Sequence, residues 1–385
     1  MSTPVVGHTG PGPLPGTDPR EAARVVLGEC PDLPFLPELP ARGIGADAIG
    51  RTAAMLADLP VDVSTRGWRL AGSEGRPARR AADLLDRDCD AIEEADEIAR
   101  GVTVDRDLAS GATAPSSSAS RILQVRVTGP WSLAATLELP GGLPVLTDRG
   151  ARRDVAESLA QGVAAHAVGL AGRLGARARV LLDEPALWHV AAGTVAGPSR
   201  FDPIPAVAAE QLALSLCRFA DAMRSAGVAE VLLRTAGGGP EAPAEWAVVA
   251  DPPRGETPLD GLCVAADALR PPAADPDADP RAVDAARAAA HATLDAAGTV
   301  LGDGRLLQLE GLPGAVRAPR SGAEVERTVA ELLALLDRLG APRYATLDRL
   351  VLTPTVAQVG AGQAAAVEAL AAAGRVAGAA PSLAE

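Results

Sequence analysis

The chain of 385 residues contains no lysine and no asparagine, so all 36 of its basic residues are arginines. Aromatic residues make up only 2% of the chain, and its apolar content is mostly Ala, Val and Leu. We attribute both biases to codon usage in a GC-rich genome, so the scarcity of Phe and Tyr says little about function. Hydrophobic residues still amount to 48%, which is typical of a folded globular protein rather than a disordered one.

Other absences narrow the class of protein. The first residues lack the charged and apolar regions of a signal peptide, and no apolar run approaches the roughly 18 residues that a membrane span needs. The net charge is −13 and basic residues form no stripe, so nucleic acid is not expected as a partner. Four cysteines lie far apart without a C-x-x-C pair: Cys30, Cys89, Cys217 and Cys263. This pattern predicts reduced, buried thiols and a cytoplasmic protein.

Short β-branched runs alternate with Ala/Leu-rich helical stretches along the whole chain, which predicts parallel strands joined by crossover helices. The expected strands are Val5–His8, Ile122–Val127, Ala178–Leu182, Glu230–Arg234, Gly261–Ala265, Arg305–Leu309 and Leu350–Thr353, with an eighth inside Val61–Leu70. The expected helices are Asp18–Leu27, Gly45–Leu59, Gly75–Gly101, Asp148–Arg173, Pro205–Ala226, Arg281–Ala297, Gly322–Leu339 and Ala361–Ala377.

This number of strands, without a G-x-G-x-x-G after the first, favours an α/β fold of the (β/α)₈ TIM-barrel type over an open doubly wound sheet. We expect one domain over residues 1–385 with N-terminal additions. The Ser/Ala-rich stretch Ala109–Ser120 is interpreted as a mobile insertion.

Active sites of such barrels form at the carboxyl ends of the strands, where Asp183 and Glu184 close the apolar run in ARVLLDEPAL. A carboxylate there could hold a substrate amino group. The alternative is structural, with Glu184 capping a helix and Asp183 accepting from backbone N–H groups.

Other candidate site residues also have both a functional and a structural interpretation. Glu38 lies in PELPARGIGADAIGR, whose charges could equally form a surface ion-pair network. Trp131 follows a strand, as a stacking surface or as part of the core. His189 lies one helical turn beyond the DEP motif, whereas His166 and His291 lie within Ala-rich helices and are not expected to be ligands. No H-x-C, C-x-x-C or H-E-x-x-H spacing occurs, so the residues make no case for a metal.

Four segments in order, LPELPARGIGADAIGR, TGPWSLAATLEL, LLDEPAL and LVLTP, resemble cobalamin-independent methionine synthase, above all its short bacterial form with only the catalytic barrel. The resemblance extends from about Val5 to Ala377 and implies a barrel of the uroporphyrinogen decarboxylase-like superfamily. It implies a 5-methyltetrahydropteroyltriglutamate–homocysteine S-methyltransferase of methionine biosynthesis, in which zinc turns the homocysteine thiol into a thiolate. It also implies that Asp183, and less directly Glu38, hold the substrate's amino group.

The zinc ligands of that family are not retained. Its H-x-C strand end is replaced by Arg234 and Ala236, its last Cys by Val356, and the serine of its early G-S-x-P turn by Pro13. Only Asp267 remains, at or beside the position of the family's carboxylate ligand. Since Arg234 also adds a permanent positive charge, the sequence predicts that no zinc is bound.

The sequence is therefore compatible with three functions. The first is a methionine-synthase-like protein that keeps an amino-acid or anion pocket while methyl transfer is lost or reduced. The second is a non-catalytic binding or regulatory protein. The third is a metal-free, decarboxylase-like enzyme, in which Arg234, Asp183 and Asp267 act on a carboxylate substrate. The expected ligand is a small carboxylate or amino-acid-like molecule. One open pocket at Arg234, Ala236, Asp267 and Val356 would keep the first and third functions, whereas a filled apolar plug there would favour the second.

Overall fold

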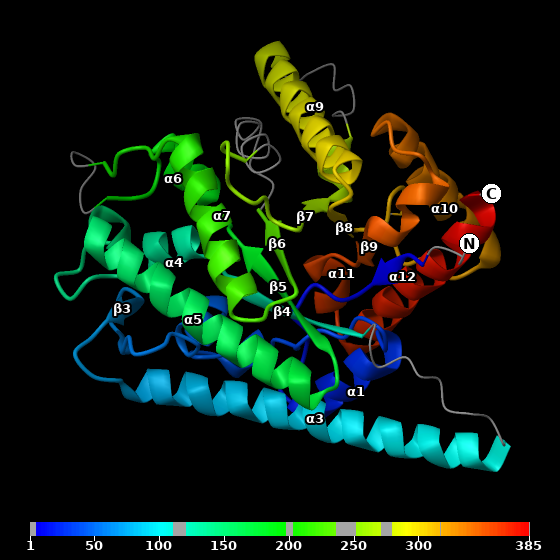
Figure 1. Cartoon of the computed structure of the whole chain (residues 1–385), viewed down its shortest axis with the longest axis horizontal. Helices are drawn as coiled ribbons and strands as arrows, with labels where there is room; N and C mark the ends of the chain where they lie inside the picture. Colours follow the sequence, from blue (N-terminus) through cyan, green and yellow to red (C-terminus); the bar gives the residue numbers. More distant parts are fainter. Residues whose placement is uncertain are drawn as a thin grey trace.

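The computed structural model describes residues 5–110, 121–197, 203–235, 252–270, 279–315 and 317–384, with the backbone alone at 102–110. A curled parallel sheet runs through the centre and helices cover its outer face, an α/β arrangement of TIM-barrel type (Figure 1). The expected alternation of strands and crossover helices is confirmed. Among the described residues, no helix is long and apolar enough to cross a membrane.

The main sheet has seven strands in the order β1-β9-β8-β7-β6-β5-β4, and all neighbours are parallel. The strands are β1 (Gly7–His8), β4 (Ile122–Thr128), β5 (Arg177–Asp183), β6 (Glu230–Arg234), β7 (Gly261–Ala265), β8 (Leu306–Glu310) and β9 (Leu350–Thr353). From β4 to β9 each strand pairs with the next strand of the sheet, as in a barrel. The first strand, β1, pairs with the last.

A short extended stretch fills the gap between β4 and β1. Phe35 forms a parallel bridge with Gln124 of β4, and Glu38 forms one with Pro13, which follows β1. The backbone N–H of Leu36 donates to the carbonyl of Gln124 at 2.9 Å. Residues 34–38 therefore occupy the eighth position of the barrel.

The eighth strand expected inside Val61–Leu70 is not part of the barrel, so that prediction is wrong. Residues Val61–Val63 (β2) and Trp68–Leu70 (β3) pair with each other as an antiparallel two-stranded sheet. Gly67 has a φ of 143°, and its carbonyl accepts from the N–H of Ser64 at 2.7 Å, which turns the chain between the two strands.

The α-helices alternate with the strands along the chain, as the sequence predicts. They are α1 (Pro19–Glu29), α2 (Ala48–Ala53), α3 (Arg76–Ser110), α4 (Pro130–Thr136), α5 (Arg149–Arg173), α6 (Leu187–Ala192), α7 (Ala209–Ser225), α9 (Pro280–Gly302), α10 (Gly322–Arg338), α11 (Val356–Gly360) and α12 (Gln363–Ala384). Short 3₁₀ turns are η1 (Pro40–Arg42), η3 (Val145–Thr147), η4 (Ala266–Leu269) and η5 (Tyr344–Arg349).

The longest helix, α3, runs along one side of the molecule beneath α1 and α5 (Figure 1). It includes Ala109 and Ser110, the first two residues of the stretch expected to be a mobile insertion. The remainder of that stretch, residues 111–120, lies outside the described residues.

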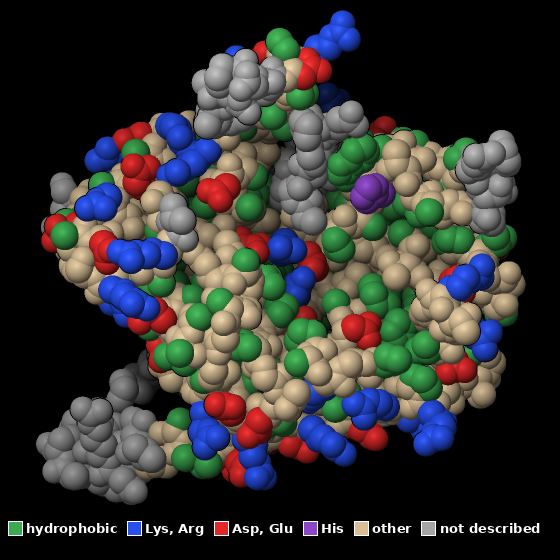
Figure 2. All heavy atoms as spheres, turned by 180° about the vertical axis from the view of Figure 1, so that it is seen from behind, with side chains coloured by type: hydrophobic (Ala, Val, Ile, Leu, Met, Phe, Trp, Pro, Cys, Tyr) green, Lys and Arg blue, Asp and Glu red, His purple; other side chains and the backbone are tan. Residues whose placement is uncertain are grey.

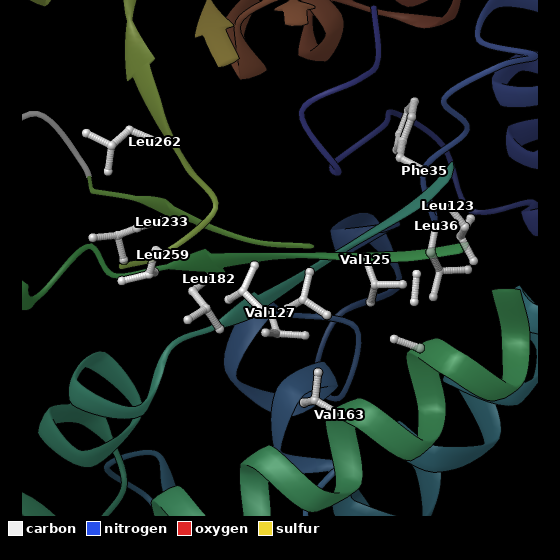
Figure 3. Close-up of a cluster of buried hydrophobic side chains, with 14 of the residues drawn as sticks. Phe35, Leu36, Leu123, Val125, Val127, Val163, Leu182, Leu233, Leu259 and Leu262 are labelled. Atoms are coloured by element: carbon white, nitrogen blue, oxygen red, sulfur yellow. The ribbon is translucent and has the colours of Figure 1, made fainter. Parts of the chain in front are cut away.

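The main core lies between the outer face of the sheet and the helices. Figure 3 shows Val125 and Val127 of β4 and Leu182 of β5 directed toward Val163 of α5. Because side chains alternate along a strand, the residues between these apolar positions face the inside of the barrel. The composition of that inner face decides what the barrel can bind.

Candidate functional site: the mouth of the barrel

The inner face of the barrel is more polar than a packed barrel core usually is. On β4 it carries Gln124, Arg126 and Thr128, at alternate positions. Lower in the barrel Arg179 of β5 pairs with Glu230 of β6, with Nη2 and Oε2 2.5 Å apart. A small apolar layer of Leu181, Leu232 and Cys263 lies above this pair and separates it from the mouth. Charge is therefore concentrated at the two ends of the barrel interior.

Five charged side chains of alternating sign form one network at the carboxyl ends of the strands, which we call the mouth network: Glu38, Arg126, Asp183, Arg234 and Glu310. Arg126 donates to Glu38 through Nη1 at 3.3 Å and to Asp183 through Nη2. Arg234 donates to Asp183 through Nη1 at 2.8 Å and to Glu310 through Nε at 2.7 Å. Asp183 thus bridges two guanidinium groups.

The network is nearly enclosed, since its side chains are between 6% and 19% exposed. Burial lowers the pKa of Arg234, but the hydrogen bond to Glu310 and the charge of Asp183 more than offset it, so the pKa rises. The pKa of Arg126 likewise rises, because Glu38 and Asp183 outweigh burial. Both arginines stay charged, and with three carboxylates the network carries a formal charge of −1. Figure 2 shows acidic and basic side chains together in a recess near the centre of one face.

The two carboxylates of the DEP motif have different surroundings. Asp183 faces the mouth, where each of its oxygens already accepts from an arginine. Glu184 accepts from the backbone N–H groups of Trp131 at 2.9 Å and Ser132 at 2.6 Å, in the first turn of α4. Burial raises the pKa of Glu184 to about 7, against the lowering effect of these donors. The structural interpretation therefore describes Glu184, which accepts from the start of α4, whereas the side chain of Asp183 accepts from two arginines rather than from backbone N–H groups.

A water-sized cavity of about 10 Å³ adjoins the network between Glu38, Arg51, Arg126 and Asp183. Arg51 of α2 is 4% exposed and donates through Nη1 to the buried Asp88 of α3 at 2.6 Å. Its Nε and Nη2 atoms, and Nε of Arg126, have no hydrogen-bond partner among the described residues. Unpartnered buried donors beside a cavity are suited to holding an ordered water or a small acceptor.

Three of the positions that the resemblance matches to zinc ligands lie in the described residues: Arg234, Asp267 and Val356. Arg234 lies in two ion pairs, and Asp267 is exposed on η4. Val356 begins α11 and offers no ligand atom, while Ala236 lies outside the described residues. Cys263 is fully buried, and burial raises the pKa of its thiol far above the usual value. Within the described ranges no three His, Cys, Asp or Glu side chains could together hold a metal ion.

Three other sequence candidates have side-chain contacts outside the mouth network. Trp131 is 7% exposed and its Nε1 donates to Ser215 of α7 at 2.7 Å, so it belongs to the packing between helices. His189 is exposed on α6 and pairs with Thr194 at 2.9 Å. His166 contacts the Cys89 sulfur at 3.9 Å between α5 and α3. Among the described residues, the sequence candidates that the structure brings together in the network are Glu38, Asp183 and Arg234.

Two members of the network were missed by sequence reasoning, although each had a signal. Arg126 follows the period-two pattern of polar residues in ILQVRVT, which is anomalous for a strand buried on both faces. Glu310 ends the apolar strand LLQLE in the same way as Asp183 ends VLLD. The carboxylates that end β5 and β8 are therefore one shared signal in the sequence.

Comparisons with known proteins gave similarity to solved structures only; no family model and no curated protein matches the chain. A methyltransferase from Methanosarcina mazei is 16% identical, with 96% of this chain and 93% of that chain covered and a TM-score of 0.44. A B12-independent methionine synthase from Shewanella sp. W3-18-1 is 12% identical with a TM-score of 0.39, and the alignment covers 67% of this chain. This chain spans 62% of that synthase.

A dihydropteroate synthase from Thermus thermophilus is 16% identical, with 96% of this chain and 98% of that chain covered and a TM-score of 0.29. These likenesses concern the fold. What the mouth can bind has to follow from its own residues.

Proposed function

We propose that the barrel mouth binds a small amino-acid-like zwitterion without zinc, and that methyl transfer from methylated folate to homocysteine is lost or much reduced in this chain. The observation that carries the proposal is the alternation of carboxylates and guanidiniums around Asp183. A ligand with one carboxylate and one ammonium group can exchange with these internal ion pairs without leaving an unpaired buried charge.

The geometry supports a specific pairing. Among the described residues, Arg234 donates through Nε to Glu310 and through Nη1 to Asp183, which leaves Nη2 for an incoming carboxylate. Glu310 and Glu38 each have one described arginine partner, so either carboxylate has an oxygen for an ammonium group. The formal charge of −1 disfavours a dianionic ligand, and it favours a zwitterion over a simple carboxylate of the same size.

Zinc chemistry is not part of this proposal because the residues do not fit the ion. A thiol-binding zinc site needs three protein ligands of N, S or O type, and Arg234 places a permanent cation where the resemblance puts the first of them. After dialysis against a weak chelator, the purified protein should hold far less than one zinc per chain. Elemental analysis that finds one zinc per chain, or turnover of homocysteine and methylated folate that a strong chelator abolishes, would contradict this part.

Ligand binding is tested separately with a matched series. L-Methionine and L-homocysteine should raise the unfolding temperature and give saturable calorimetric titrations. 4-(Methylthio)butanoate, which lacks the amino group, and 3-(methylthio)propylamine, which lacks the carboxylate, should bind at least about tenfold more weakly. Arg234→Gln should abolish binding, whereas Arg343→Gln, on an exposed ion pair, should leave it unchanged. Equal binding of the amine-free compound would reject the zwitterion site.

The metal-free decarboxylase-like alternative is favoured by one observation, the presence of two charged arginines beside Asp183 at the mouth. Such a pair could orient a substrate carboxylate. Incubation with the bound amino acid, followed by mass spectrometry for loss of carbon dioxide, distinguishes an enzyme from a binding protein.

A further inference from the structure

A groove of about 490 Å³ lies on the outer side of the barrel, between α4, α5 and α7. Its volume is within the range of small-molecule sites. Eight of its lining residues are apolar: Pro130, Trp131, Ala134, Ala156, Ala160, Leu214, Phe219 and Ala222. Four of these are alanines, whose short side chains keep the space between the helices open.

The floor of the groove has a defined structure. The Trp131 ring is held by the hydrogen bond from its Nε1 to Ser215 of α7 at 2.7 Å. The guanidinium of Arg152 lies 5.4 Å from the ring centroid, a cation–π contact. This contact holds the Arg152 guanidinium beside the apolar ring of Trp131. A positive charge beside an apolar surface suits a ligand that has an anionic group and an apolar body.

The charges of the lining are strongly one-sided, with Arg149, Arg152, Arg153 and Arg218 against Glu157 alone. Arg153 is near Asp154 and Glu157, and Arg218 pairs with Glu256 at 3.3 Å. Arg149 and Arg152 have no ion-pair partner among the described residues, and the nearby Asp148 is used as the N-cap of α5. Nε of Arg152 is buried without a hydrogen-bond partner in the described part of the chain. The groove therefore offers two arginines that form no ion pair among the described residues, and the charge of Asp148 acts on Arg152 only from a greater distance.

We infer that this groove is a binding site for a small amphipathic monoanion, whose apolar body lies along the alanines and Phe219 while its carboxylate or sulfonate binds Arg149 and Arg152. The site is separate from the mouth network, which none of its lining residues joins. It does not depend on the proposed zwitterion site. Charge complementarity selects the occupant, because an uncharged ligand would leave both arginines unpartnered.

Two probes of the same shape test the charge requirement. Anilinonaphthalene sulfonate carries an aromatic body and one negative charge, and phenylnaphthylamine has a similar body without the charge. We expect saturable fluorescence enhancement by the sulfonate, with an affinity about tenfold or more above that of the amine and falling as salt is raised.

Variants then locate the binding. Arg149→Gln with Arg152→Gln should weaken the sulfonate about tenfold and leave the amine unchanged. Ala222→Glu, at an exposed position on the rim, should weaken the sulfonate more than the amine through repulsion, even if the double variant is unstable. Arg281→Gln with Arg287→Gln, on the exposed face of α9, is the matched control and should have no effect. Equal affinities for both probes, or sulfonate binding that survives both groove variants, would overturn the inference.

Discussion

Asp183→Asn is the most informative single substitution, because Asp183 joins the two halves of the mouth network. Its side chain is 8% exposed and accepts from Arg126 and Arg234. Asparagine keeps the shape and one acceptor, but it removes the charge and turns an NH₂ group toward a guanidinium. Removing one partner of a buried ion pair typically costs about 3–5 kcal/mol. We expect about 3 kcal/mol, near the lower limit, because Arg126 keeps Glu38 and Arg234 keeps Glu310.

Urea unfolding at pH 7, followed by circular dichroism, measures this change in the free energy of unfolding. The matched control is Asp337→Asn, which removes a carboxylate from the exposed pair with Arg343 and should leave the midpoint almost unchanged. Raising the salt concentration should reduce the effect of Asp183→Asn only slightly, since buried pairs are poorly screened. A loss below about 1 kcal/mol would show that the network does not hold the mouth together and would refute the reasoning.

Two further predictions concern α5. Gly162→Ala should destabilise the protein by about 1–3 kcal/mol, because a Cβ at this position would lie 1.7 Å from the Met55 carbonyl oxygen. Gly169→Ala on the same helix is the control: its Cβ would meet nothing within 4 Å, and the substitution should stabilise the protein by about 0.5–1 kcal/mol. Equal unfolding midpoints of the two variants would contradict this prediction. Burial lowers the pKa of His166 to about 4 from 6.5, so the folded protein binds fewer protons than the unfolded chain in this range and should lose up to about 3 kcal/mol as the pH falls from 6.5 to 4. His166→Gln should flatten that pH dependence, and an unchanged slope would assign the acid sensitivity to other groups.

The strands of the barrel were predictable because each is a run of apolar residues with a clear end. The six from β4 to β9 begin and end within a residue of their expected bounds. The stretch 34–38 was not predictable in this way, since Pro34 and Pro37 suggest a loop. Both prolines lie where the ladder needs no donor: the N–H groups used are those of Leu36 and Glu38.

Helix bounds were less predictable where tertiary contacts decide them. The helix expected over Gly45–Leu59 is present only as Ala48–Ala53. Asp47 starts it by accepting from Gly50, and the same carboxylate accepts from Trp68 Nε1 in the antiparallel hairpin at 3.2 Å. After its end, the Met55 carbonyl packs closely against Gly162 of α5. Neither partner is near in sequence.

The site was predictable only as separate residues. The sequence indicates Asp183 and Arg234 as strand-end residues, but their mutual pairing depends on the register of β5 and β6, which places them directly opposite each other. Arg126 and Glu310 could be recognised only once the inner face of each strand was known. Which carboxylate meets which arginine is therefore a property of the closed barrel.

The pairing of β1 with β9 bears on how this protein is made in the cell. Gly7 pairs with Val351, which is synthesised 344 residues later. At roughly 5–20 residues per second, the first strand would wait on the order of tens of seconds without its partner on that side. During this interval its edge, and the outer edge of β8, are open to pairing with other nascent chains. Expression at lower temperature or with chaperones should therefore raise the yield of folded protein.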